Sequence, residues 1–482
     1  MTYDKRCFIS SLVILGLALI PIISSDIYYM DDLYRVVLGI KGWSGDARPF
    51  ADFFYSVLTL QSNIMPDLFP APLILAVVIL CFVFSMLSER FSNGRGILFA
   101  FCVCPLILNP LFSSNLHFRY DSPFMVLSVA FALLSFCFSF KKFVSYFLVT
   151  AVFVILTLST YQVSVNIFAA LVIVEFLFSS TKGDFRVAVL RLISRGIGFV
   201  TGYIIYAKVI IPFVQVNKYF LEYSTAVGLD KAGLLKVFDN VISSFSIFIN
   251  SQSSGFEIFV FFVVAAYVLS FASLLISSYA NKNSSTLALA LSSVVAFFMF
   301  VVLIPGVMIF SEQPLFFARG YIGFGGFISA MLIPLCWASF KILKYILIVP
   351  YIYMIGFFYA AHNAFKIEND HVETIAMSII NDINSAAKDD IKYIYVDGKR
   401  QYSAGAEVIA IAYPLIKPIL PQAFSQQQDG GLYVLKRLGL PDVKYAVAEN
   451  AKTTSDECLP KIKRHYYDIC FGGDNTAYVK FK

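Results

Sequence analysis

The sequence predicts an all-α polytopic membrane protein with a small α+β domain at its C-terminal end. Of 482 residues, 59% are hydrophobic and only 14% are charged, whereas roughly a quarter of the residues in a soluble chain are charged. The hydrophobic residues gather in long runs, and a run of about 18 or more can cross a bilayer as a helix. Beyond residue 360, polar residues return to the level of a soluble domain.

The apolar runs predict about eleven transmembrane helices, with ends accurate to about four residues. The predicted spans are Cys7–Ser24, Phe69–Leu87, Gly96–Phe112, Ser122–Phe140, Phe143–Ser159, Val163–Ser179, Leu192–Phe213, Phe256–Tyr279, Thr286–Ile304, Tyr321–Phe340 and Leu343–Ala360. One alternative concerns the two spans that flank Tyr161. If they form a single kinked or re-entrant element, the orientation of every later span is reversed.

The positive-inside rule, which weighs Lys and Arg in short loops, predicts a cytoplasmic N-terminus and an extracytoplasmic C-terminus. With that orientation the short outer loops hold Arg119 and Arg319, while the inner side is rich in basic residues. These inner residues are Lys5, Arg6, Arg90, Arg95, Lys141, Lys142, Lys182, Arg186, Arg191, Lys282, Lys341 and Lys344. The first span follows Lys5 and Arg6 and lacks a small-x-small cleavage site, so we expect an uncleaved signal anchor.

Two outer segments lie within the membrane domain, which we assign to residues 1–360. The first, residues 25–68, contains an Asp-Asp pair and a stretch, Phe50–Leu60, that suits a helix in the membrane interface. The second, residues 214–255, has an amphipathic stretch from Lys231 to Phe248 that we expect to be helical.

The tail, residues 361–482, is predicted to form the α+β domain. Apolar residues from Val372 to Ile383 recur at helical spacing. Strands are expected at Lys392–Val396 and Val443–Val447, and a hairpin from Tyr466–Cys470 and Ala477–Phe481. Cys458 and Cys470 lie close in sequence, which favours a structural disulfide in an oxidising compartment.

Ionisable and aromatic residues that could carry chemistry are predicted to meet in one layer at the outer membrane surface. Taken singly, most such loop carboxylates are solvated, and arginines at span ends often only reach toward water. The pair Asp31-Asp32 differs, because it follows a span directly and lies among aromatics, where like charges need a cationic partner or a raised pKa. The residues singled out are Asp31, Asp32, Arg48, Arg119, Tyr161, Gln162, Glu312 and Arg319.

The histidines do not indicate a metal site. The four histidines show no metal-ligand spacing, so the prediction is a site without a cofactor, although a divalent cation is not excluded. Glu175 lies inside a span near its inner end. An intramembrane carboxylate is a functional candidate by default, but at that depth we expect its side chain to reach the inner surface.

The first outer segment resembles a known family. Asp26–Arg35 followed by Gly42-Trp43-Ser44-Gly45-Asp46-Ala47-Arg48-Pro49 is similar to the first outer loop of the phage-associated, serotype-converting glucosyltransferases that modify O-antigen. Ser159-Thr160-Tyr161-Gln162 resembles the Ser-x-Tyr-Gln turn of that family, and Phe317-Ala318-Arg319 resembles its late Arg-bearing loop. One departure is Ala47, where the family pattern has Gly before Arg-Pro.

The resemblance implies a GT-C-like fold, an active site facing the periplasm of the inner membrane, and inverting transfer of glucose from undecaprenyl-phosphate glucose to an O-antigen sugar. It places the catalytic base in the first outer loop, on Asp31 or Asp32. The phosphate leaving group needs fixed positive charge, for which Arg48, Arg119 and Arg319 are candidates.

Tyr161, Gln162 and Glu312 are candidates for contacts with the sugar or the lipid head group. Two rival functions stay open, a flippase for lipid-linked sugars and an O-antigen polymerase. A transporter places its binding groups near the bilayer midplane, whereas these gather at one face. The Asp-Asp loop directly after the first span disfavours a polymerase.

Overall fold

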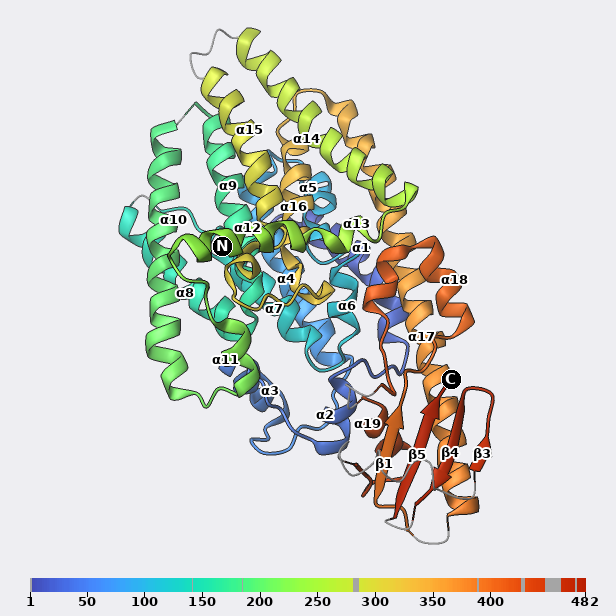
Figure 1. The fold of residues 1–482 in the computed structure, drawn as a ribbon. Coiled ribbons are helices and arrows are strands. Elements are labelled where there is room, and N and C mark those ends of the chain that lie inside the picture. The colour runs from blue at the N-terminus through green and yellow to red at the C-terminus, as the bar shows by residue number, and fades with distance from the viewer. Residues whose placement is uncertain are drawn as a thin grey trace.

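The structure is a computed structural model that describes residues 2–140, 142–183, 185–280, 286–387, 390–425, 430–446, 461–472 and 475–482. It is mostly helical, with a small mixed sheet at the C-terminal end (Figure 1). Within the described residues, eight helical segments are long and apolar enough to cross a membrane. They are Lys5–Ile23, Ala71–Phe91, Phe143–Thr160, Gln162–Thr181, Phe185–Phe213, Lys231–Ile249, Ser254–Ala280 and Lys341–Ala386.

These segments are built from α1 (Lys5–Ile23), α4 (Ala71–Phe91), α8 (Phe143–Thr160), η2 (Gln162–Ser164), α9 (Val165–Thr181), α10 (Phe185–Ile205), η3 (Tyr206–Ile210), η4 (Ile211–Phe213), α12 (Lys231–Ser244), α13 (Ser246–Ile249), α14 (Ser254–Ala280), η8 (Lys341–Leu347) and α17 (Ile348–Ala386). Shorter apolar helices complete the body: α5 (Gly96–Val103), η1 (Cys104–Leu106), α7 (Ser122–Leu134), α15 (Thr286–Val302), α16 (Ile322–Leu332) and η7 (Ile333–Cys336). The remaining helices before the tail are α2 (Asp32–Leu38), α3 (Pro49–Thr59), α6 (Phe112–His117), α11 (Lys218–Ser224), η5 (Gly306–Phe310) and η6 (Ala318–Gly320).

The prediction of about eleven spans is thus confirmed only in part. Seven predicted spans coincide with long segments, and four fall on the shorter apolar helices of 10–17 residues, whereas a transmembrane helix typically has about 20. The eighth long segment, Lys231–Ile249, is the stretch predicted to be an amphipathic outer helix. In Figure 1, α12 runs crosswise to α10, unlike the other long helices. The two spans around Tyr161 form two separate helices, α8 and α9, joined by η2.

Glu175 differs from its prediction. Its side chain on α9 is 2% exposed, and it accepts a hydrogen bond from Nε of Arg195 on α10 at 2.9 Å and another from Arg90 on α4. A buried carboxylate between two guanidinium groups ties three helices together, because removing either sign would leave an unpaired buried charge. The sequence could not reveal this, since the partners are 20 and 85 residues away.

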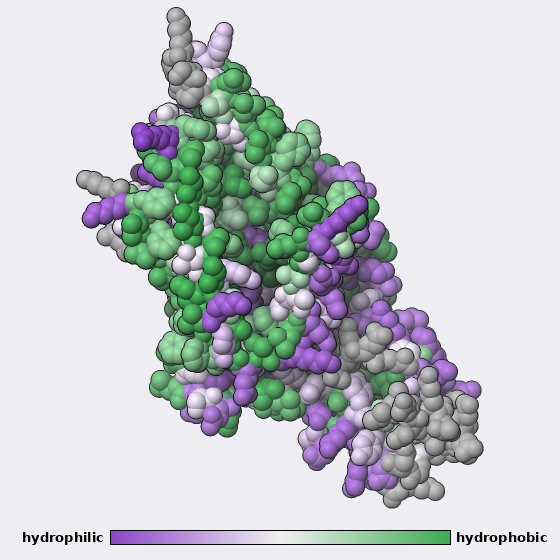
Figure 2. Space-filling view, turned by 60° about the vertical axis from the view of Figure 1, so that its left-hand side comes forward, coloured by the Kyte–Doolittle hydropathy of each residue, from purple (hydrophilic) through white to green (hydrophobic). Residues whose placement is uncertain are grey.

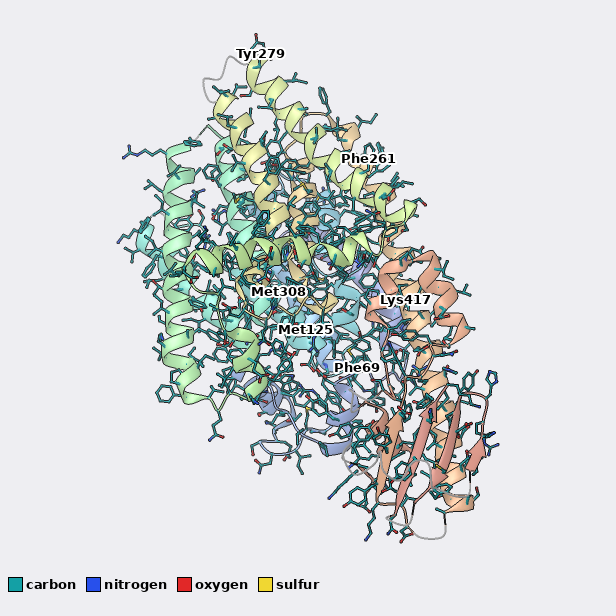
Figure 3. All side chains as sticks on the ribbon, viewed as in Figure 1. Phe69, Met125, Phe261, Tyr279, Met308 and Lys417 are labelled. Carbon is teal, nitrogen blue, oxygen red and sulfur yellow. The ribbon has the colours of Figure 1, made fainter. Side chains whose placement is uncertain are left out.

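The outer surface of the helical body is largely apolar. Figure 2 shows hydrophobic residues over most of the upper body and hydrophilic residues at the end that carries the sheet. Phe261 and Tyr279 project outward from α14, 66% and 81% exposed (Figure 3). So much exposed apolar surface is typical of a lipid-facing body.

The C-terminal sheet has the strand order β2-β1-β5-β4-β3, with parallel pairs on one side of β5 and antiparallel pairs on the other. The tail elements are β1 (Tyr393–Asp397), α18 (Ala404–Ala412), η9 (Pro414–Ile419), α19 (Gly430–Leu438), β2 (Lys444–Tyr445), β3 (Lys461–Lys463), β4 (Tyr467–Phe471) and β5 (Thr476–Phe481). The strand predicted at Lys392–Val396 is confirmed by β1, and the hairpin pairing by β4 and β5. The strand predicted at Val443–Val447 is confirmed in part by β2, and Val447 lies outside the described residues; β3 was not predicted.

The boundary predicted at residue 360 falls inside α17, which continues unbroken from the membrane body into the tail. Its apolar face from Val372 to Ile383 packs against the sheet, as the helical spacing predicts. By contrast, Leu415 and Ile416 of η9 belong to the apolar core of the helical body. Part of the tail therefore packs on the membrane helices, which positions the loop after η9 near the first outer segment.

Candidate functional site

The first outer segment presents Asp31 at the start of a short helix. Asp31 is the N-cap of α2, yet its side chain makes no capping bond, which leaves the carboxylate available to other partners. The helix ends at Gly39, whose φ of +62° is a left-handed conformation that glycine adopts without a Cβ clash.

Asp31 pairs with Arg319, which is 288 residues away in the sequence. Nη1 of Arg319 lies 3.1 Å from Oδ2 of Asp31, with the two side chains 30% and 41% exposed. Burial acts to lower the pKa of Arg319, but the charge of Asp31 and nearby phenols more than offset it, so the net shift is upward. Arg319 therefore stays cationic beside Asp31.

Asp32 has a different environment from Asp31. It is fully buried, and its carboxylate accepts hydrogen bonds from the backbone N–H groups of Tyr29, Arg119 and Tyr120 at 3.0, 2.8 and 3.2 Å. Burial raises the pKa of Asp32 well above its ordinary value, and the backbone donors oppose that rise. These contacts join two outer loops, and Asp32 lines neither of the cavities described below. The sequence did not distinguish the two aspartates; the structure does.

Arg48 is held by the turn that joins α8 and α9. Its guanidinium lies over the ring of Tyr161 at 4.5 Å, and its Nε donates to Oε1 of Gln162 at 3.3 Å. The amide nitrogen of Gln162 in turn donates to the backbone carbonyls of Asp46 and Ala47. Ala47 has a φ of +60°, which explains why a glycine suits this position.

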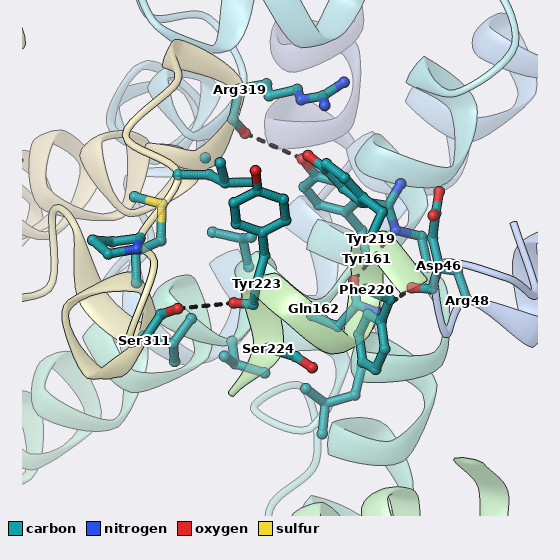
Figure 4. A pocket seen from close by; sticks show the side chains of 18 of the residues that line it. Asp46, Arg48, Tyr161, Gln162, Tyr219, Phe220, Tyr223, Ser224, Ser311 and Arg319 are labelled. Atoms are coloured by element: carbon teal, nitrogen blue, oxygen red, sulfur yellow. Dashed lines mark hydrogen bonds between the residues drawn. The ribbon is translucent and has the colours of Figure 1, made fainter. Parts of the chain in front are cut away.

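A cavity of about 830 Å³ opens between these groups and the helical body (Figure 4). In Figure 4, Arg48, Tyr161 and Gln162 lie on one side and Ser311 on the other, with Arg319 above them. Asp31 also lines this cavity. Apolar and aromatic side chains of α8, the α8–α9 turn, α9, α10 and η3 continue the wall: Leu158, Val163, Val165, Phe199, Tyr203 and Tyr206. We call this space the first cavity.

A second cavity, of about 650 Å³, adjoins the first. Both are lined by Asp31, Tyr34, Tyr219, Phe317 and Arg319. The rest of its wall comes from the first outer segment, from α6 and the loop after it, from Ala318 of η6, and from the tail. The tail residues are Pro418, Ile419, Pro421, Gln422, Ala423, Gly430 and Tyr433.

Besides Asp32, two more predicted site residues lie outside both cavities. Arg119 pairs with Asp26 at 2.6 Å and with Asp67, and its guanidinium stacks on Tyr28, so it fastens outer loops to each other. Glu312 is exposed, and its backbone N–H donates a hydrogen bond to the backbone carbonyl of Thr225. Cys470 lies in β4, but Cys458 is outside the described residues, so the disulfide stays a prediction.

The sequence analysis missed the wall formed by α11. Tyr219 and Tyr223, whose ring centroids lie 4.7 Å apart, line the first cavity, and Asn217 donates to Oδ1 of Asp46 at 2.7 Å. The signal was an aromatic cluster just after the span that ends at Phe213. The cluster is short and has no helical periodicity of its own, so the sequence does not predict that it faces the first outer segment.

A buried group supports the floor of the site. Asp121 accepts a hydrogen bond from Nε1 of Trp43 at 2.6 Å and lies 3.3 Å from Nε of Arg35. Nη1 of Arg48 is 3.8 Å from the same carboxylate.

Among the residues that the structure describes, no cluster of three or more His, Cys, Asp or Glu side chains is arranged to hold a metal ion.

The comparisons with known proteins agree with this layout. Residues 20–330 match the family described as "Glucosyl transferase GtrII". The chain belongs to the GtrII glucosyl transferase family. It is also 27% identical over 434 residues to a Salmonella phage P22 protein described as an uncharacterized 55.3 kDa protein in the gtrB 5' region, with 87% of each chain covered. No solved structure matches.

Membership in the GtrII family confirms the resemblance seen in the first outer loop and implies glucosyltransferase activity with a sugar donor and an acceptor. The matched range contains every residue that lines the first cavity, from Asp31 to Gly320. The tail residues of the second cavity lie beyond it.

Proposed function

We propose that this GtrII family member transfers glucose from undecaprenyl-phosphate glucose to an O-antigen sugar, with inversion at the anomeric carbon. The reaction takes place at the periplasmic face of the inner membrane. The N-terminus is cytoplasmic, and the tail lies in the periplasm, as the Lys and Arg asymmetry predicts.

The observation that carries the proposal is the position of Asp31, Arg319 and Arg48 around one cavity with an apolar wall. Asp31 is the base that accepts the proton of the attacking hydroxyl. Arg48 and Arg319 offer guanidinium groups that match phosphate oxygens, so the phosphate departs as a stabilised anion. No protonating acid is required, because phosphate is a stable leaving group.

The apolar wall suits the lipid part of the donor. Phe199 and Tyr203 line the first cavity, and Tyr203 is 52% exposed on the outer face of α10. The cavity therefore continues from charged groups to the surface that faces lipid. A polyprenyl chain can lie along this wall while its phosphate contacts Arg48.

The rival functions fit less well. A flippase for lipid-linked sugars would bind its cargo near the midplane, whereas the polar groups of the first cavity come from outer loops and from span ends. A polymerase would join two polysaccharide chains and would not need the family's glucose donor. Family membership favours glucosyl transfer over both.

The direct test is to incubate the purified protein with undecaprenyl-phosphate glucose and defined O-antigen fragments, and to determine the linkage of the product. We expect a glucosylated fragment whose anomeric configuration is opposite to that of the donor. Product formed from a nucleotide-activated glucose instead, or no product from either donor, would reject the proposal.

A further inference from the structure

The two cavities share one wall, and the group proposed as the base stands on it. Asp31 and Arg319 line both spaces, while Arg48, Tyr161 and Gln162 line only the first and Gln422 and Tyr433 only the second. An inverting displacement needs the attacking oxygen and the leaving phosphate on opposite sides of the anomeric carbon. The first and second cavities adjoin at Asp31, so together they satisfy this requirement.

The chemistry of the second cavity differs from that of the first. Apart from Arg319, none of its described lining residues carries a positive charge, and its wall combines aromatic side chains with a few polar groups. Tyr34 and Tyr433 lie with ring centroids 6.1 Å apart across the contact between α2 and α19. Aromatic faces with a few placed hydrogen-bonding groups suit an uncharged carbohydrate better than a phosphate.

Gln422 supplies a hydrogen-bond acceptor that the described residues do not use. Its Nε2 donates to the backbone carbonyl of Arg400 at 2.9 Å, which fixes the amide. Its Oε1 is buried and has no hydrogen-bond partner among the described residues. Leaving a buried acceptor unpaired costs roughly 1–3 kcal/mol. Gln422 lines the second cavity, so a small side-chain shift that brings Oε1 to a ligand hydroxyl would remove this cost.

A buried ion pair and an apolar core hold the tail in place where it lines the second cavity. Arg400 and Glu368 form a fully buried ion pair between α17 and the segment after β1, and Glu368 also accepts from the backbone and hydroxyl of Ser403. Leu33 of α2 belongs to the same apolar core as Leu432 of α19. Gln422 and Tyr433 are therefore held against the first outer segment.

We infer that the second cavity is the acceptor subsite, and that Gln422 and Tyr433 of the tail bind the acceptor carbohydrate and help to select it. This inference rests on the proposed function. The acceptor hydroxyl enters from the second cavity, its oxygen bonds to the anomeric carbon, and its proton passes to Asp31. The bond from that carbon to the phosphate oxygen breaks, and the electron pair leaves with the polyprenyl phosphate in the first cavity.

The family match fits this division of labour. The first cavity lies wholly within residues 20–330, whereas Gln422 and Tyr433 lie outside them. The activity shared by the family, glucosyl transfer, thus corresponds to the first cavity, where the donor is proposed to bind. The part of the wall that meets the acceptor comes from the region beyond the match.

The test compares acceptor and donor kinetics in matched variants of the full chain. Gln422→Met keeps the length of the side chain and removes its acceptor oxygen, and Tyr433→Ala removes an aromatic wall. We expect each to raise KM for an O-antigen oligosaccharide about tenfold, the factor for one hydrogen bond or ring contact, with KM for undecaprenyl-phosphate glucose unchanged. Tyr393→Ala, at an exposed tyrosine of β1, should change neither constant.

A binding measurement tests the acceptor subsite separately from catalysis, so that a variant without transfer activity can still be assessed. Isothermal titration of the same oligosaccharide should show binding to the wild-type chain and to Asp31→Asn, and at least tenfold weaker binding to Gln422→Met. Undecaprenyl phosphate should bind all three equally. Wild-type transfer combined with full oligosaccharide affinity in Gln422→Met and Tyr433→Ala would overturn the inference and leave the proposed function standing. Absence of transfer by the wild type from the lipid-linked donor would instead reject the proposed function.

Discussion

Nη1 of Arg319 lies 3.1 Å from Oδ2 of Asp31, and this ion pair stands on the wall between the two cavities. The pair joins the first outer loop to the loop before α16. The ion pair holds the Asp31 carboxylate in a fixed orientation at this wall, which suits a group proposed to accept a proton during transfer.

The neighbouring carboxylate, Asp32, should affect stability and not the chemical step. In Asp32→Asn one carboxylate oxygen becomes an NH₂ group, which cannot accept from the backbone N–H groups that now bond to it. Each lost bond to a buried donor costs roughly 1–3 kcal/mol. We expect a lower Tm, with the transfer rate of the folded fraction within about tenfold of wild type. A normal Tm with abolished transfer would assign the base to Asp32 instead.

Arg48→Lys should weaken the donor before it weakens catalysis. Lysine keeps the charge but loses the fork that matches phosphate oxygens and the stacking on Tyr161. We expect KM for undecaprenyl-phosphate glucose to rise roughly tenfold, since a charge-assisted hydrogen bond is worth about 1.5–3 kcal/mol. Arg119→Lys is the matched control: Arg119 lines neither cavity, so its donor KM should stay normal. Equal effects of both substitutions would count against the assigned role of Arg48.

Transfer should persist without divalent cations. The described residues hold no cluster suited to a metal ion, and in the proposed mechanism Arg48 and Arg319 supply the positive charge at the phosphate. Rates measured after dialysis against EDTA should equal those in the presence of magnesium. A loss that magnesium or manganese restores would show that a cation takes part.

The buried pair of Glu368 and Arg400 should be needed for the folded tail. In Glu368→Gln the guanidinium of Arg400 stays buried without its counter-charge. Breaking one side of a buried ion pair costs about 3–5 kcal/mol, so we expect a clear fall in Tm in detergent. The exposed Glu407 gives the control, since Glu407→Gln should leave Tm almost unchanged.

Sequence and structure agree where the signal is local. The long apolar runs predicted the helices, the spacing of Val372–Ile383 predicted the end of α17, and the motif of the first outer loop predicted the family. Pairings distant in sequence were not predictable. Asp31 meets Arg319, and Glu175 meets Arg195 and Arg90, only because helices pack side by side.

The candidate site shows the same limit at finer scale. Asp31 and Asp32 are adjacent in the sequence and chemically identical, so the pattern could not separate them. Their environments differ because α2 begins between them: Asp31 lines the cavities, whereas Asp32 accepts hydrogen bonds from the backbone of the loop after α6. The second cavity was equally hidden, since its tail wall depends on how η9 packs on the helical body.

The rate of glucose transfer by Asp31→Asn tests the central claim most directly. The substitution keeps the size of the side chain and removes its basicity, and general-base assistance contributes roughly 100- to 10,000-fold. With undecaprenyl-phosphate glucose and a saturating O-antigen fragment, we predict a single-turnover rate at least about 100-fold below wild type, in protein whose Tm and donor binding are retained. A rate equal to that of the wild type would contradict the account.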